Sequence, residues 1–337
     1  KLKRFEENAT LREKRDIIRR KLDERLPGVF EDAGEECPQY YYRDQGSYEI
    51  GTGVVPVDGD FDIDQGLYFE VSTEDYPDSV TLKQRVHSAL DGHTREVVIR
   101  RSCVTVFYQN DGEHCYHVDI AVYSDGSKNV DGKSRVAKGK ENSGDEFRIW
   151  EVSDPQALAD RLTSRFDDDN DRAQFRRTIR YLKRWKDVNF ETKGHAAPLG
   201  IGLTVAAYYH LQPQYADAMA GTPNDLKALT HLVRSMLNQF AYVWDADEGK
   251  YVWRLKIYLP VEPSNDLFEL MTSKQMTTFE DKLKILLVAL ETAEREVDPV
   301  VACGILQGVF GEDFPVPTKE ETAKRHAPAI VSSSNSA

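Results

Sequence analysis

The residues best suited to catalysis are aspartates that cluster in one short segment. Asp60, Asp62 and Asp64 alternate with Phe61 and Ile63, and this alternation is typical of a strand with one buried face. The three carboxylates would then project from the other face, where they repel one another at pH 7. Such an arrangement indicates a divalent cation that neutralises them.

A further aspartate can complete this acidic set. Residues 116–123 alternate again, which places His117 and Asp119 on the face opposite the apolar side chains. Carboxylates of this kind can hold two magnesium ions that activate a hydroxyl group and stabilise a pyrophosphate leaving group. We therefore predict Asp62, Asp64 and Asp119 as catalytic residues and ligands of two Mg²⁺ ions, with Mn²⁺ as an alternative metal.

Phosphate groups require a second set of residues. In the segment Gln45-Gly46-Ser47, the glycine allows backbone N–H groups to approach a phosphate closely, and the serine hydroxyl adds a donor. Lys183, within a helical pattern, can meet the outer phosphates as a point charge. Each feature alone is more often a turn or a surface lysine, and it is their combination with the aspartates that predicts nucleotide binding by Gln45, Gly46, Ser47 and Lys183.

Two other patterns are weaker. Gly132-Lys133-Ser134 resembles the end of a P-loop, but five residues separate it from Gly126 where a P-loop has four. No amphipathic helix follows to form a phosphate cradle, so we favour a solvated loop, with a lid over the cleft as the alternative. The group His114, Cys115 and His117 is too closely spaced for a separate zinc finger, and we interpret it as a strand edge.

The periodicity of the chain changes near residue 150. Before it we expect an amphipathic helix at 10–26, strands at 61–71, 96–108 and 116–123, and a flexible polar loop at 124–146. Ser153-Asp154-Pro155 is a typical helix start. The helical patterns that follow lie at 155–165, 171–189, 198–212, 223–240 and 277–295. The fold class is therefore α+β, with strands in the first half and mostly helices in the second.

Composition restricts the class of partner. The 337 residues carry a net charge of -13, and an acidic chain is poorly suited to general nucleic-acid binding, which depends on Lys and Arg. No apolar run approaches the roughly 20 residues that cross a bilayer, and the first residues show no signal-peptide core. The four cysteines form no CxxC pair, and we expect free thiols, a cytoplasmic location and no membrane association.

These motifs together resemble the nucleotidyltransferase superfamily signature, GS…DxD…D. More closely, they resemble the bacterial cyclic-oligonucleotide synthases of anti-phage defence, near the cyclic GMP–AMP synthase subgroup. The matching segments are Gln45–Ser47, Asp62–Gly66, His117–Tyr123, Phe147–Pro155, Tyr181–Asp187 and Pro198–Ala207. Asp62 and Asp64 fall directly in the match, so Asp60 is given at most a supporting role. Gly200 stands where many relatives offer a serine.

The resemblance implies a two-lobed, polymerase beta-like nucleotidyltransferase fold, with a mixed-sheet catalytic lobe and a helical C-terminal lobe. The implied regions are a spanning helix at 1–26, the catalytic lobe at 27–150, the helical lobe at 151–315 and a flexible tail at 316–337. The implied function is the joining of NTPs, ATP and/or GTP, into a cyclic di- or trinucleotide second messenger. A zinc insertion like that of the animal DNA sensor is absent, so we expect no DNA activator.

Three other functions stay open at this stage. A linear 2′-5′ oligoadenylate synthase or a single-nucleotide transferase could use the same signature, and a catalytically silent scaffold is the non-enzyme alternative. The last residues, 328–337, are small and polar. We expect a disordered end there, or, from the resemblance, a segment that a ubiquitin-transfer-like partner enzyme conjugates.

Overall fold

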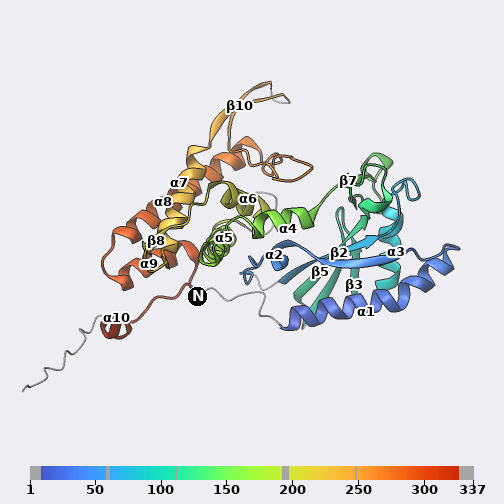
Figure 1. Cartoon of the computed structure of the whole chain (residues 1–337), viewed down its shortest axis with the longest axis horizontal. Helices are drawn as coiled ribbons and strands as arrows, with labels where there is room; N and C mark the ends of the chain where they lie inside the picture. Colours follow the sequence, from blue (N-terminus) through green and yellow to red (C-terminus); the bar gives the residue numbers. More distant parts are fainter. Residues whose placement is uncertain (1–8, 58–60, 111–112, 192–196, 247–248, 326–337) are drawn as a thin grey trace, which may run out of the picture.

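The computed structural model describes residues 9–57, 61–110, 113–191, 197–246 and 249–325. Two lobes are evident in Figure 1: a sheet-containing lobe formed by the first half of the chain and a helical lobe formed by the second. The predicted α+β class is confirmed. Among the described residues, no helix is both long and apolar enough to cross a bilayer.

The sheet-containing lobe is built on a mixed seven-stranded sheet. Its central strands, β2 (Phe61–Phe69) and β5 (Glu113–Ser124), run parallel, and the other pairs are antiparallel. The main path is β1-β2-β5-β4-β3, and β6 and β7 extend it from β5. The remaining strands are β1 (Tyr40–Asp44), β3 (Glu96–Ile99), β4 (Val104–Asn110), β6 (Arg135–Ala137) and β7 (Trp150–Val152).

Two helices cover one face of this sheet and bury its apolar side chains. Helices α1 (Ala9–Asp32) and α3 (Val80–Leu90) share a core with β2, β4 and β5. In α1 the buried residues are Leu11, Ile18, Leu22, Leu26 and Phe30, whose spacing keeps them on one helix face. The opposite face carries a smaller cluster of Tyr68, Tyr123 and Val136.

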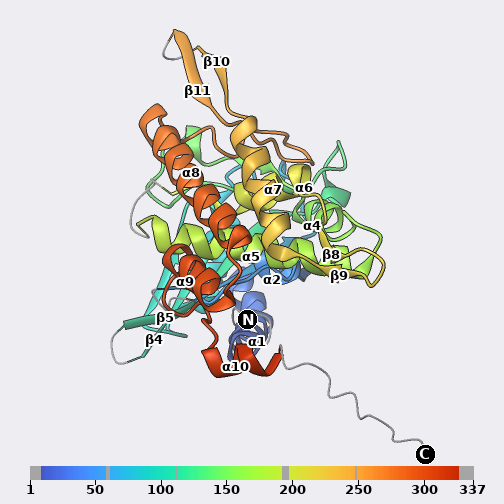
Figure 2. The ribbon, with the colours of Figure 1, turned by 90° about the vertical axis from the view of Figure 1, so that its left-hand side faces the viewer.

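The second lobe is a helical assembly around its own core. Its long central helix is α5, and two β-hairpins interrupt the helices. Figure 2 shows that the hairpin β10–β11 projects away from the helices. The elements are α4 (Pro155–Thr163), α5 (Asp169–Asn189), α6 (Gly200–His210), β8 (Tyr215–Asp217), β9 (Thr222–Pro223), α7 (Asp225–Asn238), β10 (Ala241–Asp245), β11 (Lys250–Arg254), α8 (Ser273–Arg295), α9 (Pro299–Phe310) and α10 (Lys319–Arg325).

The expected helix start after Ser153 is confirmed in detail. The Asp154 side chain accepts a hydrogen bond from the backbone N–H of Ala157 at 2.9 Å, and Pro155 occupies the first turn of α4. This cap satisfies a donor that the first turn of a helix leaves unpaired. It therefore fixes the point at which the chain passes from the sheet into the helical lobe.

Four expectations differ from the structure. The helix expected at 10–26 continues through Pro27 to Asp32, and the strand expected at 96–108 is split into β3 and β4. The polar segment 124–146, expected to be a flexible loop, contains β6, whose Val136 and Ala137 are buried; two apolar residues are too few to produce a periodic signal. Helix α10 lies within 316–337, where a flexible tail was expected.

Several further expectations concern residues that are not fully described. Asp60 and residues 328–337 lie outside the described residues, so the expectations for Asp60 and for conjugation of the tail stay predictions. The side chains of His114 and Cys115 are also outside them, and the zinc alternative is not tested. Cys37, Cys103 and Cys303 are free thiols, as expected.

Candidate active site

The acidic cluster forms where β2 and β5 lie side by side. Their parallel register places Asp62 beside His117 and Asp64 beside Asp119. Ile63, between the two aspartates of β2, is buried in the core below, as the alternation predicts. The fold thus brings together aspartates that are separated by more than fifty positions in the sequence.

One set of donor atoms is close enough to share a metal ion. Single ligand atoms of Asp62, His117 and Asp119 all lie within 4.8 Å of one another. The Nε2 atom of His117 lies 3.3 Å from a carboxylate oxygen of Asp62, and the hydroxyl of Thr105 donates to Asp119 at 2.5 Å. Two carboxylates and an imidazole fit a divalent cation.

His117 was not predicted as a ligand. The signal was present in the sequence, because the alternation of β5 places His117 on the same face as Asp119. Polar residues on an exposed strand face are common, however, and only the pairing with β2 sets His117 beside Asp62. Thr105 could not be identified either, because it comes from the neighbouring strand β4.

Asp64 is positioned differently from Asp62. Its carboxylate lies against Gly46, where a Cβ atom would come within 1.8 Å of Oδ2. Burial, and then the nearby Asp119 carboxylate, raise the pKa of Asp64 to about 6. A buried carboxylate beside a like charge is costly, and a cation between the two would relieve that cost. The site therefore fits the implied metal by its charge as well as by its donors.

Lys183 reaches the same site from helix α5. Burial, followed by repulsion from Lys186, lowers the pKa of its amine to about 8, and Asp64 acts in the opposite direction. Its Nζ atom donates to the hydroxyl of Thr52 at 3.2 Å. The structure thus brings Lys183 together with the aspartates, although the two groups belong to different lobes.

Gln45 lies in the interior of the catalytic lobe. Its side chain is buried, donates to the hydroxyl of Tyr68 at 3.1 Å and accepts from that of Tyr123 at 3.3 Å. A Cβ atom at Gly66 would come within 2.2 Å of its amide nitrogen. These contacts fix the start of the Gly46-Ser47 loop, which is a positioning role that the sequence did not indicate.

A cavity of about 240 Å³ is lined by the predicted phosphate-binding residues and by one of the predicted aspartates, Asp64. One wall carries Gln45, Gly46, Ser47 and Asp64, and Lys183 faces the same space. Helices α4 and α6 also line it. The residues contributed by these helices are Pro155, Leu158, Ala159, Leu162, Gly200, Ile201 and Thr204.

One face of α5 ties the two lobes together beside this cavity. Arg180 donates to the backbone oxygen of Gly51 at 2.7 Å, and Arg184 lies 3.4 Å from that of Val55. Lys183 contacts the same loop through Thr52. Positions 180, 183 and 184 share one face of a helix, so this loop of the catalytic lobe rests on a single helical surface.

The parallel pair β2–β5, its acidic cluster and the adjoining Gly46-Ser47 loop all lie within one segment that resembles a known family. Residues 40–123 match the family model described as "Cyclic GMP-AMP synthase DncV-like, nucleotidyltransferase domain". A curated cyclic GMP-AMP synthase from Escherichia albertii is 28% identical over 178 residues, which cover 50% of this chain and 36% of that protein. The aligned part is thus about a third of the length of that relative.

Solved structures show the same fold over nearly the whole chain. The cyclic AMP-GMP synthase DncV of Vibrio cholerae gives a TM-score of 0.65 at 15% identity, covering 94% of this chain and 95% of that one. The Bradyrhizobium diazoefficiens CD-NTase CdnG, solved in complex with GTP, gives 0.64 at 17% identity, covering 91% and 90%. The predicted fold class and the resemblance to bacterial DncV-like nucleotidyltransferases are confirmed.

Proposed function

We propose that this protein is a metal-dependent cyclic oligonucleotide synthase that joins NTPs, ATP and/or GTP, into a cyclic di- or trinucleotide. The observation that carries the proposal is the shared cavity, which is lined by Ser47 and Asp64 from one lobe and by Lys183 from the other. That juxtaposition supplies phosphate-binding groups and acidic groups at one place. The defence role is proposed from the family resemblance.

Each residue has a part in the proposed reaction. A ribose hydroxyl of one nucleotide attacks the α-phosphorus of another, and pyrophosphate leaves. Asp62, Asp64 and Asp119, with His117 alongside, would hold two divalent cations. These cations would supply Lewis-acid charge for the attacking hydroxyl oxygen and for the oxygen of the leaving pyrophosphate. Lys183 balances the charge of the outer phosphates, and Asp119, held by Thr105, orients the attacking hydroxyl. A second transfer between the ends of the linear product would close the ring.

Relatives support the choice of substrate. V. cholerae DncV has been solved with a nonhydrolyzable GTP and with the linear intermediate 5′ pppA(3′,5′)pG. We carry ATP and GTP over to this chain as proposed substrates. We still predict that catalysis needs no nucleic-acid activator.

The decisive experiment identifies the product. The purified chain is incubated with α-³²P-labelled ATP and GTP and Mg²⁺, and the products are separated before and after phosphatase treatment. We expect a labelled product that phosphatase does not change, because a ring has no terminal phosphate. A product that loses label or shifts would indicate linear 2′-5′ oligoadenylate synthesis. Label that stays on a protein or RNA acceptor would indicate single-nucleotide transfer, and no product under any nucleotide pair would indicate a silent scaffold.

The lowered pKa of Lys183 predicts a pH dependence of nucleotide binding. A lysine carries its charge below its pKa, so the phosphate contact is complete well below pH 8 and is lost as pH rises through about 8. The apparent KM for NTP should therefore rise between pH 7 and 9. In Lys183→Gln the KM for NTP should be high at both pH 7 and pH 9, with kcat changed less. A variant whose KM still rises with pH as in wild type would contradict the role of Lys183 in phosphate binding.

The position of His117 predicts an effect on metal preference. Imidazole nitrogen suits Mn²⁺ better than Mg²⁺, which strongly prefers oxygen ligands. His117→Asn should therefore weaken Mn²⁺ binding by about tenfold and change Mg²⁺ binding little. Mn²⁺ affinity is measured by electron paramagnetic resonance without nucleotide, with His87→Asn on α3 as the matched control. Equal losses of Mn²⁺ and Mg²⁺ affinity would show that His117 is not a metal ligand and only holds the Asp62 side chain in place.

A further inference from the structure

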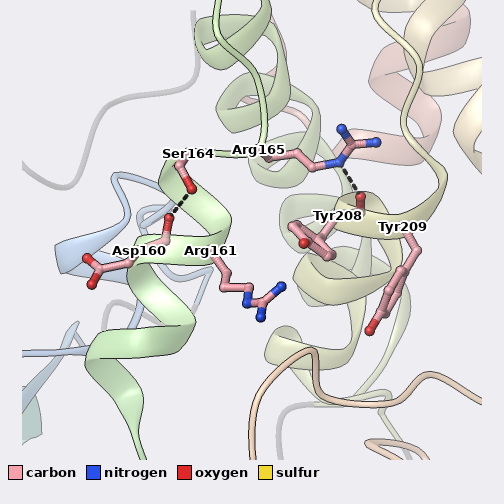
Figure 3. Close-up of a pocket in the computed structure, with 6 residues that line it drawn as sticks. All are labelled: Asp160, Arg161, Ser164, Arg165, Tyr208 and Tyr209. Atoms are coloured by element: carbon pink, nitrogen blue, oxygen red, sulfur yellow. Dashed lines mark hydrogen bonds between the residues drawn. The ribbon is translucent and has the colours of Figure 1, made fainter.

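A second cavity, of about 590 Å³, lies in the helical lobe outside the proposed active site. Its size is within the range of roughly 300–1,000 Å³ that is usual for small-molecule sites. It lies between the end of α4 and the end of α6, as Figure 3 shows. The lining residues are Asp160, Arg161, Ser164, Arg165, Tyr208 and Tyr209.

The two cavities are lined by different residues of the same helices. In α4, Leu158 and Leu162 line the active-site cavity, whereas Arg161 lines the second one. In α6, Thr204 faces the active site, and Tyr208 belongs to the second cavity. None of the predicted catalytic or phosphate-binding residues lines the second cavity. A ligand bound by the second cavity alone would therefore contact none of those residues.

The charge that faces the second cavity is positive. The guanidinium of Arg161 extends toward Tyr208 and Tyr209, whereas the Asp160 carboxylate points away from them (Figure 3). Gln156 donates to that carboxylate at 3.1 Å. Within the described part of the chain, the Arg161 side chain has neither a hydrogen bond nor an ion pair. An arginine of this kind is available for an anion.

Arg165 is a fixed second cation. Its Nε atom donates to the backbone oxygen of Tyr208 at 2.8 Å, and its guanidinium carbon lies 4.6 Å from the ring centroid of Phe166. These contacts hold the side chain against the wall of the cavity. The positive field near Arg161 therefore does not depend on one flexible side chain.

The aromatic wall supplies a different kind of contact. The rings of Tyr208 and Tyr209 lie 5.1 Å apart between centroids, with an interplanar angle of 75°. Tyr209 is 42% exposed, so part of its ring is free to stack against a planar group. Aromatic side chains beside arginine are the combination that binds a base and a phosphate together.

We propose that this cavity is a second nucleotide-binding site, in which Tyr209 stacks on the base and Arg161 binds the phosphate. A purely apolar ligand would leave Arg161 desolvated without a partner, which is costly. A simple anion would leave most of the volume and the tyrosine wall unused. The proposal does not depend on the proposed function of the active site.

Photoaffinity labelling separates the two sites. The full chain is irradiated with 8-azidoadenosine 5′-monophosphate, and the labelled residues are located by peptide fragmentation. We expect label at Tyr208 or Tyr209. Arg161→Glu and Tyr209→Ala should each reduce labelling of this cavity by about tenfold and leave any label in the active-site cavity unchanged. Arg295→Glu, an exposed arginine on α8, is the matched control and should change neither.

Competition tests the ligand class. Unlabelled AMP should protect the cavity, whereas adenosine or inorganic phosphate at the same concentration should protect much less. Label confined to the active-site cavity would overturn the proposal, as would labelling that both variants leave unchanged while circular dichroism shows them folded. Equal protection by phosphate and AMP would replace the nucleotide site by a simple anion site.

Discussion

An Asp62→Ala/Asp64→Ala double variant is expected to lose product formation by about 1,000-fold or more while it stays folded. Metal-held charge contributes several kcal/mol to the transition state, and each loss of about 1.4 kcal/mol is tenfold in rate. The variant removes the two aspartates of β2 and leaves Asp119 of β5 in place. Activity is measured by release of pyrophosphate and by thin-layer separation of products, with Asp32→Ala at the exposed end of α1 as the control.

Removing the charge of Asp64 should not lower stability. The pKa of Asp64 is raised from 3.8 to about 6, so the folded state binds its proton more tightly than the unfolded state. The stability linked to that proton is present below pH 3.8 and is lost as pH rises to about 6, at most about 3 kcal/mol. In a chelator, Asp64→Asn should therefore melt higher than wild type above pH 6, with the difference vanishing toward pH 4. The assignment of Asp62 and Asp64 would be contradicted by an Asp64→Asn variant that melts lower than wild type at pH 7.5. It would also be contradicted by a double alanine variant that retains synthesis.

Gly46→Ala is expected to lower activity by about 100-fold, because a displacement of about 1 Å at reacting groups costs that much. Gly46 has a φ of +65° and a Cβ there would come within 1.8 Å of an Asp64 carboxylate oxygen. The alanine adds roughly 1–2 kcal/mol of backbone strain and must also move either the loop or the carboxylate. The measurement is kcat/KM together with the melting temperature.

Gly92→Ala separates strain from the contact with Asp64. Gly92 has a similar φ of +71°, and nothing lies within 4 Å of a Cβ at that position. It should therefore lose comparable stability from the backbone and keep full activity. If both variants lose activity equally, the contact between Gly46 and Asp64 has no catalytic importance. If Gly46→Ala is fully active, the predicted role of the loop is wrong.

The parts of the site that follow strand alternation could be predicted from sequence. Alternation with buried residues predicts the strand face on which Asp62, Asp64 and Asp119 lie, and the register of β2 with β5 agrees with it. The partners that depend on strand pairing could not be identified. His117 needed the register of β2 with β5, and the contacts of Gln45 needed Tyr68 and Tyr123 brought together from separate strands.

The fold shows the same division between local and long-range signals. The five long helical patterns of the second half correspond to α4, α5, α6, α7 and α8, since a 3.6-residue period persists over many positions. Short or uniformly apolar elements carried no such signal, and β6 and α9 were missed. The second cavity was also invisible, because Arg161 and Tyr209 are separated in sequence by almost all of α5 and α6.

The contacts of Arg180, Lys183 and Arg184 with one loop restrict how the length of this chain can vary. Each residue added to a helix rotates everything beyond it by about 100° and advances it by 1.5 Å. A single insertion between positions 180 and 183 would therefore turn the phosphate-binding lysine away from the cavity or release the arginine that holds the loop. Insertions and deletions can be accommodated in exposed connections such as that between β8 and β9, but this turn of α5 must keep its residue count.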